Sequence, residues 1–228
     1  MRKLQFTKGE FYHIYNRGTE KRIVFSNKND YYRFLYLLFA CNDTAPLLNS
    51  QHYYRGSASI VNSHRKRNLL VDIVCFCLMP NHYHLILRER TDGGIQKFMQ
   101  KLGTGYTMYF NTKYDRNGVL FQGAFKAIRV DQESYFTHLT RYIHLNPAEL
   151  CEPLWKDNGI KKQEGTFKFV KEYPWSSLSD YLGKHRFEPL LDTKTIKELA
   201  LPPQAYDAYM MEWIAEHRNL LGGLTLED

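Results

Sequence analysis

The sequence has few cysteines, no long apolar run and fewer acidic than basic residues. Its cysteines, Cys41, Cys75, Cys77 and Cys151, lack the two-residue gap of zinc knuckles, so we expect reduced, structural thiols in a cytoplasmic protein. No stretch approaches the roughly 18 apolar residues of a membrane span. No apolar segment follows the charged N-terminus either, so we expect neither a membrane anchor nor a signal peptide.

The charge and the aromatic content indicate the class of partner. Lys and Arg outnumber Asp and Glu by 31 to 24, which leaves a net charge of +7. This balance favours a polyanion, either nucleic acid or an anionic membrane surface, although a mildly basic soluble protein is also consistent with it. Aromatic residues make up 15% of the chain, with 17 tyrosines, so a full core and surfaces for base stacking are both available.

Apolar periodicity predicts the secondary structure. The predicted elements are a strand at 11–15, a helix at 29–41 that starts within 26–30, a central strand at 69–79 buried on both faces, a strand at 82–88, a helix at 93–113, an extended segment at 119–130 that ends in a strand, and a helix that Asp131 caps and Pro147 ends. This order predicts an α+β fold of the ferredoxin-like (RRM-like) type. Its antiparallel sheet should carry helices on one face, plus one added helix.

The chain divides into two expected parts. Residues 1–183 should form the main domain, and the polar segment 42–68 should be a loop insertion or a hairpin within it. Residues 184–228 should be a C-terminal helical extension, with helices at 193–199 and 204–217. Gly103 and Gly105 lie inside the predicted helix at 93–113, where we expect them to allow close approach of a neighbouring backbone.

Two histidines lie two residues apart in the strand at 82–88. His82 and His84 should project from one face of the sheet and Tyr83 from the other, toward the core. Two imidazoles that point at one place are half of a metal site, and zinc is the default ion for such a pair. The alternative is a pair of surface histidines on a half-exposed strand.

The helix before Pro147 carries a second pair. Tyr142 and Asn146 are four residues apart and should share a helix face, with His138 one turn earlier. The Asn146 amide oxygen is a suitable hard ligand beside two imidazoles, and a tyrosine hydroxyl beside a divalent cation is a competent nucleophile. Packing by Tyr142 and capping by Asn146 would explain the same pattern without chemistry.

Several sequence pieces together resemble a known family. They are Met-Pro-Asn-His-Tyr-His at 79–84, Tyr-Ile-His-Leu-Asn-Pro at 142–147, Tyr-Asn-Arg-Gly at 15–18, Asn-Gly-Val-Leu-Phe-Gln-Gly at 117–123, and Tyr-Pro-Trp-Ser-Ser at 173–177. The combination is similar to the single-tyrosine HUH transposases. Within that family it is most similar to the branch associated with repetitive extragenic palindromes (REP). The resemblance covers about residues 8–183.

The resemblance implies a nuclease domain and a set of site residues. His82, His84 and Asn146 would bind Mg²⁺ or Mn²⁺, and Tyr142 would attack single-stranded DNA to give a covalent 5′-phosphotyrosine and a free 3′ hydroxyl. Insertion-sequence members of the family use glutamine as the third ligand, and Asn146 is shorter. The rival nucleophiles in this sequence are Tyr106, Tyr109 and Tyr135, of which the first two lie on an apolar stripe.

The implied partner is single-stranded DNA with hairpin or palindromic repeats, in a protein associated with the nucleoid. Candidate DNA contacts are Arg17, Arg65, Lys66, Arg67, Lys126, Arg129 and His138. A homodimer that exchanges the tyrosine helix is one option, and a monomer is the other.

Two alternative functions stay open. The first is a non-catalytic single-stranded nucleic-acid-binding protein, which would explain the positive charge and the aromatic residues. The second is a metal-dependent hydrolase with water as the nucleophile, which would normally have carboxylates near its site, and the motifs contain none.

Overall fold

The computed structural model describes residues 4–46, 67–153, 155 and 159–216. Its four strands form one antiparallel sheet in the order β2-β3-β1-β4. The strands are β1 (Phe11–Arg17), β2 (Val71–Met79), β3 (His82–Glu89) and β4 (Lys126–Val130). This strand order is that of the ferredoxin-like fold, so the predicted fold class is confirmed.

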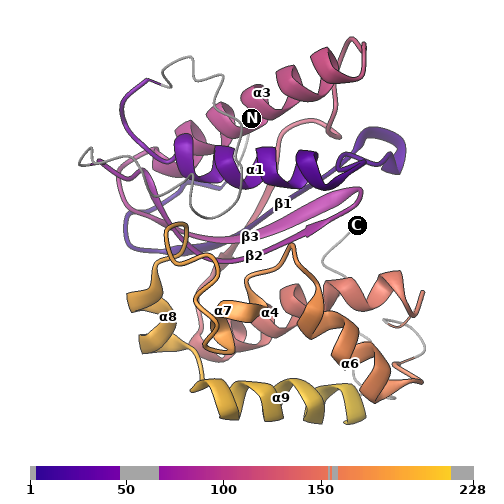
Figure 1. Ribbon diagram of the computed structural model, residues 1–228. Helices are drawn as coiled ribbons and strands as arrows, with labels where there is room; N and C mark the ends of the chain where they lie inside the picture. Colours follow the sequence, from indigo (N-terminus) through magenta and orange to yellow (C-terminus); the bar gives the residue numbers. More distant parts are fainter. Residues whose placement is uncertain (1–3, 47–66, 154, 156–158, 217–228) are drawn as a thin grey trace.

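Helices cover both faces of the sheet (Figure 1). The helices α1 (Lys28–Ala40) and α3 (Gly94–Lys113) lie on one face, and α4 (Glu133–Leu145) lies on the other. The prediction of helices on one face holds for α1 and α3, and α4 is the added helix. We call these two surfaces the α1/α3 face and the α4 face.

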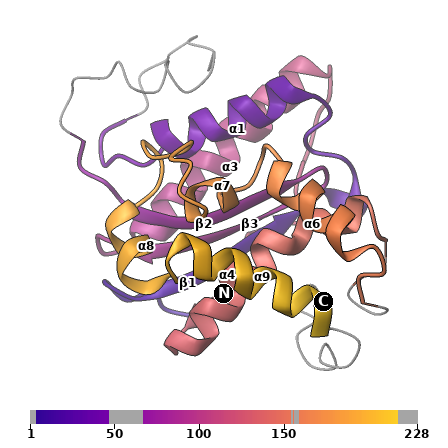
Figure 2. The ribbon, with the colours of Figure 1, turned by 60° about the horizontal axis from the view of Figure 1, so that its bottom comes forward.

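The C-terminal elements gather on the α4 face, where α9 lies close to α4 in both views (Figures 1 and 2). The remaining elements are η1 (Thr19–Lys21), η2 (Asn146–Leu150), α6 (Gln163–Glu172), α7 (Leu178–Tyr181), α8 (Thr193–Leu199) and α9 (Pro203–Glu216). The predicted helices α8 and α9 are confirmed, whereas α6 was not expected. No helix in the described ranges has the length and apolar content needed to cross a bilayer.

Strand β2 lies at an edge of the sheet, so its predicted central position is wrong. Every residue of β2 is nevertheless buried, as predicted. The outer edge of β2 pairs with the segment 175–177. Leu78 N donates to Trp175 O at 2.9 Å, and Ser177 N donates to Phe76 O at 3.0 Å. This segment satisfies the backbone groups that an open edge strand would expose.

The start of α1 agrees with the predicted start signal. Asn27 accepts a hydrogen bond from Asn29 N, and the Asp30 carboxylate accepts from Asn27 N at 3.2 Å, which completes a capping box. The same carboxylate is fully buried and also accepts hydrogen bonds from Tyr109, Lys113 and Tyr114. Asp30 therefore joins the first turn of α1 to the end of α3.

Two local predictions are wrong. Helix α4 begins one residue after Gln132, and no side chain caps it, so Asp131 is not its cap. A methyl group at Gly103 would meet nothing within 4 Å, and one at Gly105 would make only ordinary contact with Leu37, so neither glycine permits a close approach. Segment 42–68 is described only at its ends, where Asn42 accepts hydrogen bonds from the amides of Leu70 and Val71 at the start of β2.

Candidate active site

The histidine pair opens β3 on the α4 face. His82 and His84 are 4% and 1% exposed, and their ring centroids lie 5.1 Å apart. Tyr83 points to the opposite face, where its ring packs 5.1 Å from that of Phe34. The predicted division of the three side chains between the two faces is therefore confirmed. The alternative of exposed surface histidines does not hold, because both side chains are buried.

A neighbouring amide determines the tautomer of His82. Its Nδ1 lies 2.6 Å from Asn81 Oδ1, and Asn81 Nδ2 donates to Lys21 O at 3.4 Å. Because the amide oxygen only accepts hydrogen bonds, His82 must donate from Nδ1. In the neutral ring the lone pair is then on Nε2, which is the form that a metal ligand requires.

Helix α4 places Tyr142 beside the histidine pair. The Tyr142 side chain is 6% exposed, and its ring centroid lies 5.9 Å from that of His84, edge to face. Phe136, Leu139 and Ile143 are buried along the same helix. These apolar residues pack α4 against the sheet. Tyr142 therefore lies over the sheet face that carries the two histidines.

Asn146 follows Tyr142 by one helical turn. Its Nδ2 donates to Tyr142 O at 3.0 Å, and the residue is fully buried. Within the described part of the chain, no donor reaches its Oδ1. A buried carbonyl oxygen without a donor is unfavourable, and a cation would satisfy it. Among the described residues, no three His, Cys, Asp or Glu side chains form a cluster that could hold a metal ion.

A pocket of about 70 Å³ adjoins the histidines at the end of β1. Arg17 and Lys126 line it, and the Lys126 ammonium lies 5.7 Å from the centre of the Tyr15 ring. The other lining residues are Tyr15, Asn16, His82, Tyr83, His84, Gln122 and Ala124. The predicted basic residues Arg17 and Lys126 are thus brought together with the histidine pair. Tyr15 and Gln122 lie in the family-like sequence pieces, but they were not predicted as site residues.

Backbone contacts unite several of the family-like sequence pieces around this pocket. Gln122 N donates to Arg17 O at 2.9 Å, and Gly18 N donates to Asn81 O at 2.8 Å. A methyl group at Gly18 would lie 2.4 Å from Arg22 O, so this position requires glycine. The pieces at 15–18, 79–84 and 117–123 therefore meet at one end of the sheet.

The other predicted DNA contacts have different surroundings. Arg129 is half exposed and pairs with Glu10 at 3.0 Å. Arg67 donates to the Phe39 and Asn42 carbonyl oxygens and lies 3.8 Å over the Phe39 ring, so its guanidinium is used within the fold. Arg65 and Lys66 lie outside the described residues. His138 Nδ1 lies 2.7 Å from Arg141 Nη2, and burial lowers the pKa of His138.

The rival tyrosines lie elsewhere or face other partners. Tyr106 donates to Val24 O at 2.6 Å and Tyr109 donates to Asp30, both from α3 on the α1/α3 face. Burial raises the pKa of Tyr109 to about 12, which disfavours its phenolate. Tyr135 lies in the first turn of α4, more than one turn before Tyr142.

A buried polar cluster lies behind Tyr142 and was missed by sequence reasoning. His144 Nε2 lies 2.9 Å from Ser177 Oγ and 3.3 Å from Cys75 Sγ, while its Nδ1 lies 2.7 Å from the Tyr206 hydroxyl. Burial lowers the pKa of His144 to about 3, so the ring is neutral. Through Tyr206, α9 of the predicted C-terminal extension is joined to the helix that carries Tyr142.

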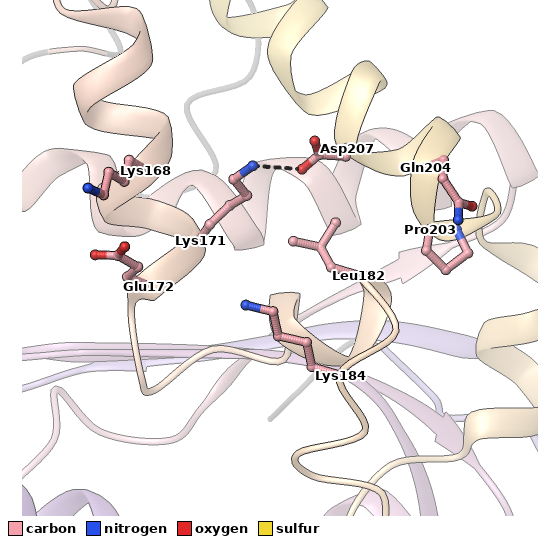
Figure 3. Close-up of a pocket in the computed structure, with 8 residues that line it drawn as sticks. All are labelled: Lys168, Lys171, Glu172, Leu182, Lys184, Pro203, Gln204 and Asp207. Carbon is pink, nitrogen blue, oxygen red and sulfur yellow. Dashed lines mark hydrogen bonds and ion pairs between the residues drawn. The ribbon is translucent and has the colours of Figure 1, made fainter.

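A larger pocket, of about 410 Å³, lies between α6, α7 and α9 (Figure 3). Its lining includes Lys168, Lys171 and Lys184, with Glu172 and Asp207 among them. The Lys171 ammonium lies 3.2 Å from the Asp207 carboxylate. The lining of this pocket has no imidazole, so the smaller pocket, which His82 and His84 line, is the better candidate for chemistry.

Comparisons with known proteins identify a family and a similar fold. The family model of IS200-like transposases matches residues 32–146. A solved structure of a REP-associated tyrosine transposase bound to a REP hairpin is similar in fold, with a TM-score of 0.52 and 12% sequence identity over 82% of this chain and 87% of that chain. No curated protein matches the sequence.

Proposed function

We propose that this chain, which belongs to the family of IS200-like transposases, cleaves and rejoins single-stranded DNA at hairpin or palindromic sequences with Tyr142 as the nucleophile. The observation that carries the proposal is the position of the Tyr142 ring, 5.9 Å from the ring of His84. A phenol beside two buried imidazoles is suited to attack on a phosphate held there.

The proposed metal is Mg²⁺ or Mn²⁺, with His82, His84 and Asn146 as ligands. The lone pair on His82 Nε2 and the buried Asn146 Oδ1 support this donor set. All three ligands are neutral, so a bound divalent ion would keep its full charge for the scissile phosphate and would offset charge in the transition state. An amide oxygen as third ligand favours these harder ions over zinc.

The Tyr142 hydroxyl oxygen would attack the phosphorus in line. A bond from Tyr142 to phosphorus forms, the bond from phosphorus to the 3′ oxygen breaks, and the proton lost from the phenol is balanced by the proton gained at the leaving 3′ hydroxyl. The 5′-phosphotyrosine keeps the energy of the broken ester, so attack by another 3′ hydroxyl rejoins strands without ATP. The 5′ polarity of the linkage comes from the family resemblance.

The proposed partner is single-stranded DNA that contains a hairpin. Arg17 and Lys126 would bind phosphates at the pocket beside the histidines, and the Tyr15 ring would offer a stacking surface. Arg129, at the far end of β4, would extend this basic edge. The REP-associated transposase of similar fold is bound to a REP hairpin in its solved structure, and this supports a hairpin here.

The proposed site is built within one chain. His144 contacts Tyr206 of α9, and the Arg141 guanidinium lies 4.1 Å over the Tyr209 ring. Exchange of α4 between two copies would have to break these contacts or carry α9 along. The proposal therefore favours cleavage in one chain, and a homodimer would be expected to keep Tyr142 with its own histidines.

A covalent-adduct assay tests the proposal. Hairpin-bearing single-stranded DNA, labelled at its 3′ end, is incubated with the protein and Mn²⁺ and then denatured. We expect the label to migrate with wild-type protein and with Tyr135→Phe, the matched control on the same helix, but not with Tyr142→Phe. A 5′ label should be released on a fragment that ends in a 3′ hydroxyl.

Two results would contradict the proposal. An adduct formed by Tyr142→Phe would assign the nucleophile elsewhere. Tight binding of hairpin DNA by the wild type without adduct or cleavage on any substrate, with either metal, would favour the non-catalytic binding protein.

A further inference from the structure

A third histidine lies directly behind the proposed ligand His84. His13, on β1, is fully buried, and its Nε2 lies 2.9 Å from His84 Nδ1. The register pairs Tyr15 with His84 and His13 with Ile86, so His13 reaches His84 along the diagonal between adjacent strands. The two imidazoles are nearly parallel, with an interplanar angle of 17°.

We propose that His13 is a positioning residue that accepts a hydrogen bond from His84 Nδ1 and thereby holds the lone pair of His84 on Nε2. The inference rests on the proposed function, in which His84 is a metal ligand. Between two neutral rings one nitrogen donates and the other accepts, so two arrangements satisfy the 2.9 Å contact. Only the arrangement in which His84 donates leaves His84 Nε2 able to bind a cation.

The position of His13 is well defined by the fold. Its strand lies between β3 and β4, where His13 is opposite Ile86 and Ile128. The Tyr15 ring stacks on it at 4.9 Å. His13 is inaccessible to solvent, so bulk water does not compete for its contact with His84 Nδ1.

The two proposed histidine ligands are supported in parallel ways. Asn81 Oδ1 accepts from His82 Nδ1, and His13 Nε2 would accept from His84 Nδ1. Each ring would therefore have its own acceptor, one in the β2–β3 turn and one on the neighbouring strand. Such partners commonly change metal affinity by roughly 10- to 100-fold when they are removed.

A pair of nearly isosteric variants tests the inference. His13→Gln places an amide oxygen where Nε2 was and keeps an acceptor, whereas His13→Met has similar length and no comparable acceptor. Mn²⁺ affinity is measured without DNA by electron paramagnetic resonance of the free ion. We expect His13→Met to bind Mn²⁺ about 10- to 100-fold more weakly than wild type and His13→Gln to bind within a few-fold of it.

His84→Ala and Tyr142→Phe separate the two proposals. If His84→Ala lowers Mn²⁺ affinity and His13→Met does not, the inference about His13 is wrong and the proposed metal site stands. If wild type binds Mn²⁺ no better than His84→Ala, the metal site fails and this inference fails with it. Tyr142→Phe should bind Mn²⁺ like wild type, whatever its effect on the adduct.

The tautomer can be read in wild-type protein, so the inference is testable even where His13→Met does not fold. Protein labelled with ¹⁵N at histidine should show a proton on Nδ1 of His84 and none on Nε2, with His84→Ala used for assignment. A proton on His84 Nε2 in the metal-free protein would overturn the inference.

Discussion

The two faces of the sheet use polar groups in opposite ways. On the α1/α3 face, β3 presents Tyr83, Leu85 and Leu87, all buried among apolar side chains. On the α4 face, the same strand presents His82 and His84, which contact further imidazole and amide groups. Adjacent residues of a strand point to opposite faces, so one strand can contribute to stability on one side and to chemistry on the other.

Buried polar groups occur on both faces, but their partners differ. Asp30 on the α1/α3 face accepts from two backbone amides, two phenols and one ammonium group. Asn146 on the α4 face keeps an oxygen that no donor in the described chain reaches. A fully satisfied buried group is typical of a structural role, whereas an unsatisfied one indicates where a ligand fits. Asp30 therefore fits a structural role, whereas Asn146 fits the proposed ligand-binding role.

Replacing neighbouring residues of β3 gives the largest contrast between the faces. We expect His84→Ala to abolish the covalent adduct while the protein stays folded. Leu85→Ala should keep the adduct in the folded fraction but lower the free energy of unfolding by about 3 kcal/mol, because it leaves a cavity in the core. Adduct assays and urea unfolding on both variants measure this. If His84→Ala and Leu85→Ala lose adduct formation to the same extent in the folded protein, the proposed division between the two faces is wrong.

Asp30→Ala should be the most disruptive polar change on the α1/α3 face. It leaves Lys113, Tyr109 and Tyr114 without their acceptor, and we expect a loss of about 3 kcal/mol in the free energy of unfolding. Burial by itself would raise the pKa of Asp30, but hydrogen bonds from Lys113, Tyr114 and Tyr109 outweigh it and hold the pKa below 3.8.

The contribution of the ionised Asp30 is therefore present above the unfolded pKa near 3.9 and is lost as pH falls through the lower folded value. Urea unfolding of wild type and variant at pH 7 and at pH 3 checks both parts. If the free energies of unfolding of wild type and Asp30→Ala differ as much at pH 3 as at pH 7, the charge of Asp30 does not make the expected contribution.

The buried His144 on α4 should make the free energy of unfolding decrease in acid. Its folded pKa is about 3, well below the unfolded value near 6.5, so the unfolded state binds the proton first. Stability is then fully present above about pH 6.5 and falls by up to about 1.4 kcal/mol per pH unit between there and pH 3. The groups that face the ring, Cys75, Ser177, Tyr181 and Tyr206, bring no charge that would offset this.

Unfolding free energies between pH 7 and pH 4 test the effect. His144→Gln should flatten the pH dependence, while the matched control His185→Gln, at an exposed position, should leave it as in wild type. The same slope in His144→Gln and wild type would show that this ring does not cause the acid sensitivity.

Gly103→Ala should have the smallest effect and the opposite sign. No atom lies within 4 Å of the added methyl group, and alanine favours a helix by about 1 kcal/mol over glycine. We therefore expect a slight rise in the melting temperature. Gly94→Ala, at the start of the same helix, is the contrasting control, because its methyl group would lie 2.2 Å from Leu70 O. A rise for both variants would contradict this difference in packing around α3.

Much of the fold followed from local sequence patterns. Helices α1, α3, α8 and α9 and the hairpin of β2 and β3 agree closely with their predicted ranges, because apolar period and start or stop signals act within a few residues. The cap of α4 was predicted wrongly, because the helix begins one residue later than Asp131 would cap it. The purpose of Gly103 was also predicted wrongly, because a close approach depends on a neighbour that the sequence does not reveal. Helix α6 was missed, although Phe167 and Val170 are buried on its inner side.

Local spacing in the sequence was enough to predict which chemical groups share a face. The spacing of two placed His82 and His84 on one strand face, and the spacing of four linked Tyr142 to Asn146 on one helix, since each is a property of local backbone geometry. The contacts between groups that are distant in the chain depend on how the strands and helices pack. His13 contacts His84, Ser177 contacts His144, and the segment 175–177 closes the edge of β2, although these partners lie far apart in the chain. Periodicity predicts the face to which a side chain points, whereas the packing of strands and helices determines which groups that side chain contacts.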